Sequence, residues 1–303
     1  MTIEDKAKTT GEWAETHKPV VVAVDGSERN RSAVLWAANE AADHGASVVL
    51  VTALQELVVT RPHGRGRSRE QETLDMLADV RAEVRHVVDE QVVETEAVVG
   101  APVEALLREA ADARLVVVGK RGLGGFARVL VGSTSIALAG RSPVPVAIVP
   151  DGWEPGGHAG EPIVLGVDPA RPDHRPMHLA FRRARRLGVP LMAVHGWETP
   201  AAFAWKSEVV AGALAEHEQE VGRMFDELLA TWTDRFPEVE VRPVRVHQHP
   251  ATAILEAAEE AQLVVLGRHD TGIFGGFPVG SVARAVLHYA ETPVLTVPSG
   301  SGE

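Results

Sequence analysis

The chain of 303 residues repeats itself, and this repeat limits its possible folds more than any other feature of the sequence. Three motifs of the first half recur in the same order in the second half, each 148 residues later. The matching pairs are Leu115–Gly119 with Leu263–Gly267, Gly132-Ser133 with Gly280-Ser281, and Pro145–Pro150 with Pro293–Pro298. Three collinear matches at one offset indicate a duplication, so the chain is expected to contain two copies of one domain.

A fourth match marks the beginning of each copy. Val20–Asp25 corresponds to Ile163–Asp168, which lies 143 residues later. The segment 151–161 contains four glycines and one proline, a composition typical of a flexible connection. We therefore expect a flexible N-terminal segment over residues 1–18, a first domain over 19–150, a linker over 151–161, a second domain over 162–298 and a tail over 299–303.

Each copy alternates apolar runs with amphipathic segments. Val20–Val24 is a continuous apolar run, typical of a parallel strand that is buried on both faces. This alternation predicts an α/β fold with two tandem, doubly wound, Rossmann-like sheets of five parallel strands. The expected strands are Val20–Val24, Ser47–Ala53, Val93–Val99, Leu115–Val118, Val146–Val149, Ile163–Val167, Leu191–His195, Val239–Val246, Leu263–Leu266 and Val294–Val297. The expected helices are Asn30–His44, Arg69–Val88, Pro102–Ala113, Ser133–Ala139, Arg175–Leu187, Val210–Trp232, Ala251–Ala261 and Ser281–Tyr289.

Composition excludes several classes of function. The chain has no cysteine, which excludes disulfides, thiolate catalysis and cysteine-ligated metals. Its net charge of −12 argues against unspecific binding to nucleic acid or to anionic lipid. The first 18 residues lack the apolar core of a signal peptide, and the apolar runs are shorter than the ~18 residues of a membrane helix. We expect a cytoplasmic protein without a membrane span.

One glycine-rich loop carries the most informative pattern. Gly119, Gly122 and Gly132-Ser133 lie between an apolar strand and the next expected helix. Glycines allow a close approach of the backbone to a ligand, and a helix N-terminus favours phosphate. Taken alone, the pattern fits an ordinary loop with a helix cap equally well.

The spacing Gly119-x2-Gly122-x9-Gly132-Ser133 resembles the nucleotide-binding signature of the universal stress protein family. The opening motif Val-Ala-Val-Asp25-Gly-Ser and the closing motif Pro-Val-Pro-Val-Ala-Ile-Val-Pro resemble that family too. The resemblance covers both copies and matches the tandem, actinobacterial type. It implies a strand order of 3-2-1-4-5, which places Asp25 and Gly119 on opposite sides of one crevice. It also implies ATP as the ligand, with Mg²⁺.

The resemblance assigns roles to residues of the first copy. Asp25 is expected beside the ribose and the metal–phosphate region, although an Asx-turn or helix cap would also explain it. The backbone of Ala53 would pair with the adenine edge, and Arg121 would neutralise phosphates. Further expected contacts are Ala23 and Val24 with the nucleoside, Val118, Gly119 and Gly122 with ribose and phosphates, and Gly132, Ser133 and Thr134 with phosphates.

The second copy departs from the pattern. Asp270 stands where the second motif glycine belongs, and Pro169-Ala170 replaces Gly26-Ser27. A carboxylate at this place repels phosphates, so we expect the first copy to bind ATP at least tenfold more tightly. The candidate residues of the second copy are Val167, Asp168, Gly196, Leu266, Gly267, Gly280, Ser281 and Val282.

Four histidines are expected along the carboxyl ends of the strands in the second copy: His195, His247, His249 and His269. Solvated loop side chains are the favoured interpretation, with a metal site as the alternative.

The favoured function is an ATP-binding regulator of a stress or dormancy response, whose stress role comes from the resemblance alone. Two alternatives stay open: an ATP-dependent or ATP-hydrolysing enzyme on a related fold, and an interaction scaffold with vestigial nucleotide sites. The sequence lacks the Ser-Gly-Gly-x-Asp-Ser and His-x-Gly-His motifs of such enzymes, so a binding protein is favoured and only weak ATPase activity stays open. The apolar fifth strands, Val146–Val149 and Val294–Val297, are expected edge strands, and family members pair through this strand. We therefore expect the copies to pair and the chain to form a homodimer, with an unidentified protein as its downstream partner.

Overall fold

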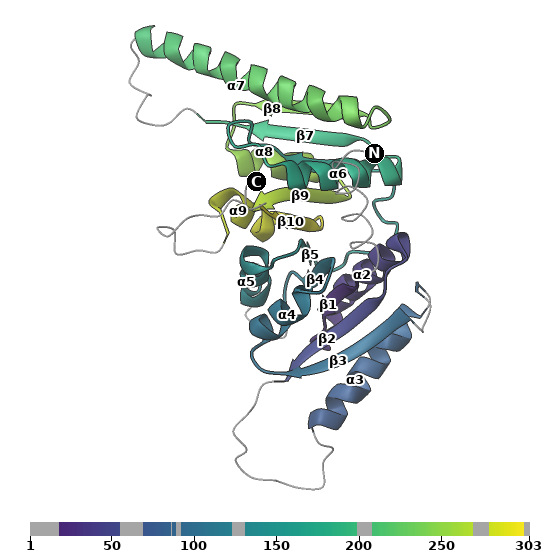
Figure 1. Cartoon of the computed structure of the whole chain (residues 1–303). Coiled ribbons are helices and arrows are strands. Elements are labelled where there is room, and N and C mark those ends of the chain that lie inside the picture. The colour runs from purple at the N-terminus through teal and green to yellow at the C-terminus, as the bar shows by residue number, and fades with distance from the viewer. Residues whose placement is uncertain are drawn as a thin grey trace, which may run out of the picture. The chain divides into compact units, whose positions relative to one another are not determined.

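The computed structural model describes residues 18–54, 69–85, 87–88, 92–122, 131–198, 208–268 and 279–299 of the chain. The chain divides into two compact units, with the boundary between Gly157 and His158. In the described residues, each unit is built from parallel strands connected by helices (Figure 1). None of the described helices combines the length and the apolarity that crossing a membrane requires.

The first unit alternates strands with helices. Its elements are, in chain order, β1 (Val20–Ala23), η1 (Glu28–Asn30), α2 (Arg31–His44), β2 (Val48–Leu54), α3 (Arg69–Val84), β3 (Val93–Val99), α4 (Pro102–Ala110), β4 (Leu115–Gly119), α5 (Ser133–Arg141) and β5 (Val146–Val149). The strand order within this unit is β3-β2-β1-β4-β5, and the neighbouring strands are parallel. The predicted α/β fold with a doubly wound parallel sheet is confirmed.

The second unit repeats the same topology. Its elements are β6 (Ile163–Gly166), α6 (His174–Leu187), β7 (Leu191–Gly196), α7 (Glu208–Arg235), β8 (Val241–Val246), α8 (Pro250–Ala258), β9 (Leu263–Arg268), α9 (Ser281–Tyr289) and β10 (Val294–Pro298). The order β8-β7-β6-β9-β10 matches that of the first unit element by element. The registers agree too, since Val20 pairs with Val48 in the first unit and Ile163 pairs with Leu191 in the second.

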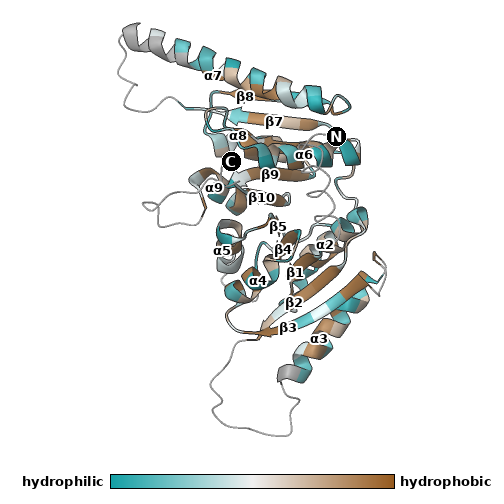
Figure 2. Cartoon of the chain, in the orientation of Figure 1, coloured by the Kyte–Doolittle hydropathy of each residue, from teal (hydrophilic) through white to brown (hydrophobic). Residues whose placement is uncertain are grey.

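The core of each unit lies along its central strands, which are coloured as hydrophobic in Figure 2. All side chains of β4 and β5 are buried, because helices cover both faces of the central sheet. The outer strands β3 and β8 are largely exposed and carry more polar residues. Packing of the central strands in the core positions their carboxyl ends. The candidate site lies at those ends.

Seven of the eight expected helices begin or end one to four residues away from their expected bounds, and two of them show the reasons. The helix expected over Arg69–Val88 ends at Val84, whose carbonyl accepts hydrogen bonds from both Val87 and Val88 in a turn. The helix expected over Val210–Trp232 runs from Glu208 to Arg235. The Arg235 guanidinium lies 5.4 Å from the ring centroid of Trp232, a cation–π contact that supports the additional turn.

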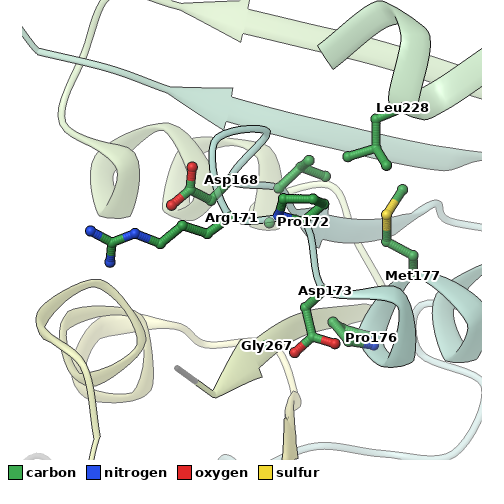
Figure 3. A pocket seen from close by; sticks show the side chains of 10 residues that line it. Asp168, Arg171, Pro172, Asp173, Pro176, Met177, Leu228 and Gly267 are labelled. Atoms are coloured by element: carbon green, nitrogen blue, oxygen red, sulfur yellow. The ribbon is translucent and has the colours of Figure 1, made fainter. Parts of the chain in front are cut away.

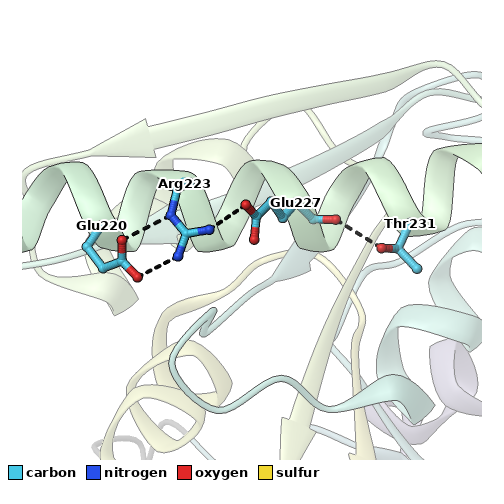
Figure 4. Close-up of polar contacts among 4 residues, drawn as sticks. All are labelled: Glu220, Arg223, Glu227 and Thr231. Carbon is cyan, nitrogen blue, oxygen red and sulfur yellow. Dashed lines mark hydrogen bonds and ion pairs between the residues drawn. The ribbon is translucent and has the colours of Figure 1, made fainter.

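Along its exposed face, α7 has a series of ion pairs and one side chain–backbone hydrogen bond (Figure 4). Arg223 contacts Glu220 with an Nη2–Oε1 distance of 2.6 Å and Glu227 with an Nη1–Oε1 distance of 2.5 Å. The Thr231 hydroxyl donates to the backbone carbonyl of Glu227 at 3.0 Å. Oppositely charged side chains three and four residues apart favour the helical conformation, so the contacts of Arg223 support α7.

Candidate functional site

The carboxyl ends of β1 and β4 lie side by side in the first unit, because Val20 to Val22 pair with Leu115 to Val117 in parallel. β2 lies beyond β1, and β5 lies beyond β4. The strand order therefore reverses between β1 and β4, and such switch points open a crevice at the carboxyl ends of the strands. The turn after β1 and the beginning of the loop after β4, described as far as Gly122, flank this switch point, which we call the first crevice.

Asp25 closes the turn after β1. Its Oδ1 accepts hydrogen bonds from the backbone N–H of Ser27 at 2.9 Å and from the Ser27 hydroxyl at 2.7 Å. Gly26 has φ +77°, a conformation that glycine adopts without steric cost. Asp25 thus forms the Asx-turn that the sequence offers as one explanation for it.

Gly122 lies directly against Asp25 across the crevice. A Cβ atom built on Gly122 would be only 2.8 Å from Asp25 Oδ2, closer than real Cβ atoms approach other atoms. Any side chain at position 122 would therefore displace the carboxylate. The structure brings together two residues that are expected at one site, and it gives Gly122 a steric reason to be glycine.

The base of the crevice is held by two polar side chains. Asn30, which is buried, donates from Nδ2 to the carbonyl of Ala23 at 2.9 Å, at the end of β1. The Ser135 hydroxyl donates to the carbonyl of Gly119 at 2.8 Å, at the end of β4. Gly119 itself leaves little room, because a Cβ atom on it would lie 3.1 Å from the Arg121 carbonyl oxygen. Asn30 and Ser135 are not predicted as site residues from the sequence, although each is a polar residue within or next to a largely apolar helix.

The N-terminus of α5 lies next to the loop after β4. The backbone N–H of Gly132 donates to the Lys120 carbonyl at 2.8 Å, and the Lys120 N–H donates to the Val149 carbonyl at 2.7 Å. The N-cap residue of α5 is Gly132, which has no side chain to cap this end. Ser133 is exposed and Thr134 is half-buried. The first N–H groups of a helix lack partners within the helix and attract anions, so this end is suited to phosphate.

Arg121 contacts a carboxylate of its own chain. Its Nη2 lies 2.8 Å from Asp151 Oδ2, and the two side chains are 38% and 19% exposed. Arg29 also faces this carboxylate, with its Nε at 3.9 Å from Asp151 Oδ2. The expected partner of Arg121 was a phosphate group; the structure pairs it with Asp151.

The other expected residues of the first copy lie beneath the crevice. Val24 and Val118 are 4% and 3% exposed, so their side chains belong to the core. Ala23 and Ala53 are half-buried near the ends of β1 and β2. The loop residues 123–130 lie outside the described part of the chain.

The corresponding crevice of the second unit contains a small hollow of about 30 Å³, room for one or two water molecules (Figure 3). Asp173 lies beside Gly267 at its base, and a Cβ atom on Gly267 would be 3.5 Å from Asp173 Oδ2. The lining residues include Val167, Asp168, Arg171, Met177 and Leu228. Asp168 repeats the turn of Asp25, since its Oδ1 accepts from the Ala170 N–H at 3.1 Å.

Asp173 occupies the position of Asn30 in the second copy, 143 residues later. Its Oδ1 accepts from the Arg175 N–H at 3.1 Å and caps α6, whereas its Oδ2 is buried without a hydrogen-bond partner. A carboxylate cannot donate the hydrogen bond that the amide of Asn30 gives to the end of β1. The second crevice therefore carries additional negative charge at its base.

His195 holds the corresponding strand end in the second unit. Its Nδ1 lies 3.0 Å from the Val167 carbonyl oxygen, and its ring stacks on Trp197 with centroids 5.7 Å apart. Burial lowers the pKa of His195, and the hydrogen bond to Val167 and the charge of Asp168 only partly oppose this. The expectation of a solvated side chain is wrong for His195, which is 8% exposed. The signal was its place at the end of an apolar run.

The other histidines differ from His195. His247 and His249 are exposed, and His249 Nδ1 accepts from the Ala251 N–H at the start of α8. His269 lies outside the described residues, as does Asp270. Among the residues that the structure describes, no group of three His, Asp or Glu side chains forms a metal site.

The remaining expected residues of the second copy are placed as follows. Gly196 ends β7 with no space beside it, because a Cβ atom would lie 2.9 Å from the Gln248 carbonyl oxygen. Leu266 is buried in β9. Gly280 precedes α9, where Ser281 is exposed and Val282 is half-buried.

Comparison with known proteins agrees with these two units. The model of the family described as universal stress protein matches residues 16–150 and again residues 161–298. A universal stress protein of Mycolicibacterium smegmatis is 32% identical, with 93% of this chain and 97% of that protein covered. One of Mycobacterium tuberculosis is 31% identical, covering 93% and 95%. The crystal structure of an Archaeoglobus fulgidus universal stress protein shares the fold, with a TM-score of 0.67, 19% identity, and 94% and 98% of the chains covered.

Proposed function

Because the chain belongs to the universal stress protein family, with two tandem domains, we propose that its first unit binds ATP and acts as a nucleotide-dependent regulator in a stress or dormancy response. The observation that carries this proposal is the contact between Gly122 and Asp25. Through this contact, the start of the loop after β4 and the Asp25 turn face each other at the switch point of the sheet, where α/β folds bind ligands.

The chemistry of the first crevice suits a nucleotide with several phosphates. The N-terminus of α5, where Gly132 is the N-cap, offers N–H donors, and Ser133 and Thr134 add hydroxyl groups. Arg121 adds a cation on the same loop. The half-buried Ala23 and Ala53 leave apolar surface near the strand ends, where a nucleoside would pack.

Mg²⁺ would be held by Asp25 together with the phosphates of the nucleotide. This metal often takes only one or two carboxylates from a protein and fills its other positions with water and phosphate oxygens. Asp25 supplies one carboxylate at the crevice, so the residues present fit such an ion. Bound Mg²⁺ would neutralise phosphate charge close to the carboxylate of Asp25.

The decisive experiment is to heat the purified protein and identify the small molecules that are released. We expect an adenine nucleotide, and calorimetry with ATP and Mg²⁺ should then give a saturable site in nucleotide-free protein. Neither nucleotide in the extract nor heat of binding would contradict the proposal and favour an interaction scaffold. Release of ADP and phosphate over many turnovers would instead favour the enzyme alternative.

A further inference from the structure

Arg121, in the loop after β4, forms an ion pair with Asp151, which follows β5. A carboxylate of the protein therefore lies beside this loop. The 2.8 Å contact is partly shielded from water, since the Asp151 side chain is 19% exposed. Arg29 adds a second, weaker attraction to the same carboxylate oxygen at 3.9 Å. The cation that this loop offers to a phosphate group therefore already has a partner.

The backbone on both sides of Arg121 is held in place. Lys120 is bonded through its N–H to Val149 and through its carbonyl to Gly132. Gly122 lies against Asp25. The guanidinium of Arg121 is thus attached to a positioned backbone between the Asp25 turn and the start of α5. With its backbone held, Arg121 could change partners only through a change of side-chain rotamer.

We propose that Asp151 is a specificity-determining residue of the first unit, a built-in competitor for the phosphate end of the nucleotide. This proposal rests on the proposed function. A ligand that draws Arg121 into the crevice must break the pair with Asp151, whereas a nucleoside without phosphates leaves the pair intact. Asp151 therefore weakens the binding of ATP and leaves the binding of adenosine unchanged.

In the second unit, the position equivalent to Asp151 is not a carboxylate. Val149 pairs with Gly119 in the first sheet, as Val297 pairs with Gly267 in the second. By this register, Asp151 corresponds to Ser299. The Ser299 hydroxyl donates to the Arg268 carbonyl at 2.5 Å, so a neutral group bonded to the backbone replaces the carboxylate. At this position, the first unit therefore has a carboxylate and the second unit has a hydroxyl group.

The test is Asp151→Asn in the full chain, with affinities for Mg²⁺-ATP and for adenosine measured by calorimetry. Partly exposed ion pairs contribute up to about 1 kcal/mol, so the affinity for ATP should rise about two- to fivefold. The affinity for adenosine should not change. Glu154→Gln is the matched control, because Glu154 is an exposed carboxylate of the same segment and its removal changes the net charge equally. This control should leave both affinities unchanged.

A double-mutant cycle shows whether Asp151 acts through Arg121. Arg121→Gln should lower the affinity for ATP, and Asp151→Asn should have no further effect in that background. Should Asp151→Asn fold poorly, Asp151→Ser repeats the test with the residue found in the second unit.

The outcomes separate this inference from the proposed function. Equal ATP affinity of the wild type and the Asp151 variants overturns the inference and leaves the proposed function standing. An equal gain in Glu154→Gln also overturns it, because the effect would then be one of net charge. ATP binding by Asp151→Asn but not by the wild type supports both proposals. The absence of nucleotide binding by both the wild type and Asp151→Asn overturns both.

Discussion

Asp25 Oδ2 lies 2.8 Å from the point that a Cβ atom of Gly122 would occupy. These residues are 97 positions apart in the sequence, and the neighbouring positions of β1 and β4 in the sheet bring them together. A side chain at position 122 therefore requires the Asp25 carboxylate to move. Adding one methyl group at position 122 therefore tests whether the contact between Gly122 and Asp25 is needed for ligand binding.

Gly122→Ala should weaken ATP binding by the first unit at least about tenfold, a loss of ~1.4 kcal/mol, because the methyl group displaces the Asp25 carboxylate. Calorimetry measures the affinity, and thermal unfolding shows whether the variant folds. The matched control is Gly212→Ala on α7, where an added Cβ atom meets nothing within 4 Å. Unchanged ATP affinity in folded Gly122→Ala would contradict the proposed site.

Asn30→Asp should destabilise the first unit by about 1–3 kcal/mol, because the Ala23 carbonyl loses its donor and a charge replaces a buried amide. Chemical denaturation measures this loss. Asn39→Asp makes the same change on α2 at a half-buried position, where the amide donates to the Leu35 carbonyl. Its effect should be smaller, and an equal loss in both variants would count against a special role for Asn30.

The stability of the second unit should depend on pH through His195. Burial lowers the pKa of this imidazole below its ordinary value of 6.5, so the unfolded chain takes up a proton at higher pH than the folded chain. The contribution to the free energy of unfolding is complete above about pH 6.5 and is lost as the pH falls through this value. Denaturation at several pH values measures the slope.

His195→Thr introduces the residue type found at the equivalent position of β2, where Thr52 is buried. This variant should lose the part of the pH dependence that arises between pH 6.5 and the lowered pKa of His195. An identical slope in wild type and variant would show that other groups control the acid response.

The two units should differ in their affinity for ATP by at least about tenfold, because the second crevice carries Asp173 in place of Asn30 and Asp270 in place of a motif glycine. Calorimetry at limiting ATP should resolve one tight site per chain. Asp270→Gly should narrow the difference. Two equal sites in the wild-type chain would refute the predicted asymmetry.

The repeat predicted two copies of one domain, the alternation of apolar runs with amphipathic segments predicted the α/β class, and the family resemblance predicted the strand order. The internal repeat and the apolar runs reflect the order of the strands and helices along the chain. Many different sequences can specify the same order. The approach of Asp25 to the glycine loop follows from that arrangement, because strand order alone decides which loops meet.

The partners of individual side chains could not be predicted in the same way. Arg121 was expected to face phosphates, yet it pairs with Asp151 because the turn after β5 brings that carboxylate within reach. His195 was expected in solvent, yet it stacks on Trp197 and contacts the Val167 carbonyl. Such contacts depend on rotamers and on turns of a few residues, for which apolar periodicity carries no information.

The hydrogen bonds of Asn30 and Ser135 hold both strand ends at the base of the first crevice before a ligand arrives. The conformational entropy of these groups is thus lost during folding, and association does not have to order them again. Binding of the proposed nucleotide at this base would therefore require no rearrangement of the strand ends. The observed association rate should therefore increase in proportion to ligand concentration, without the plateau that a slow opening of the base would impose.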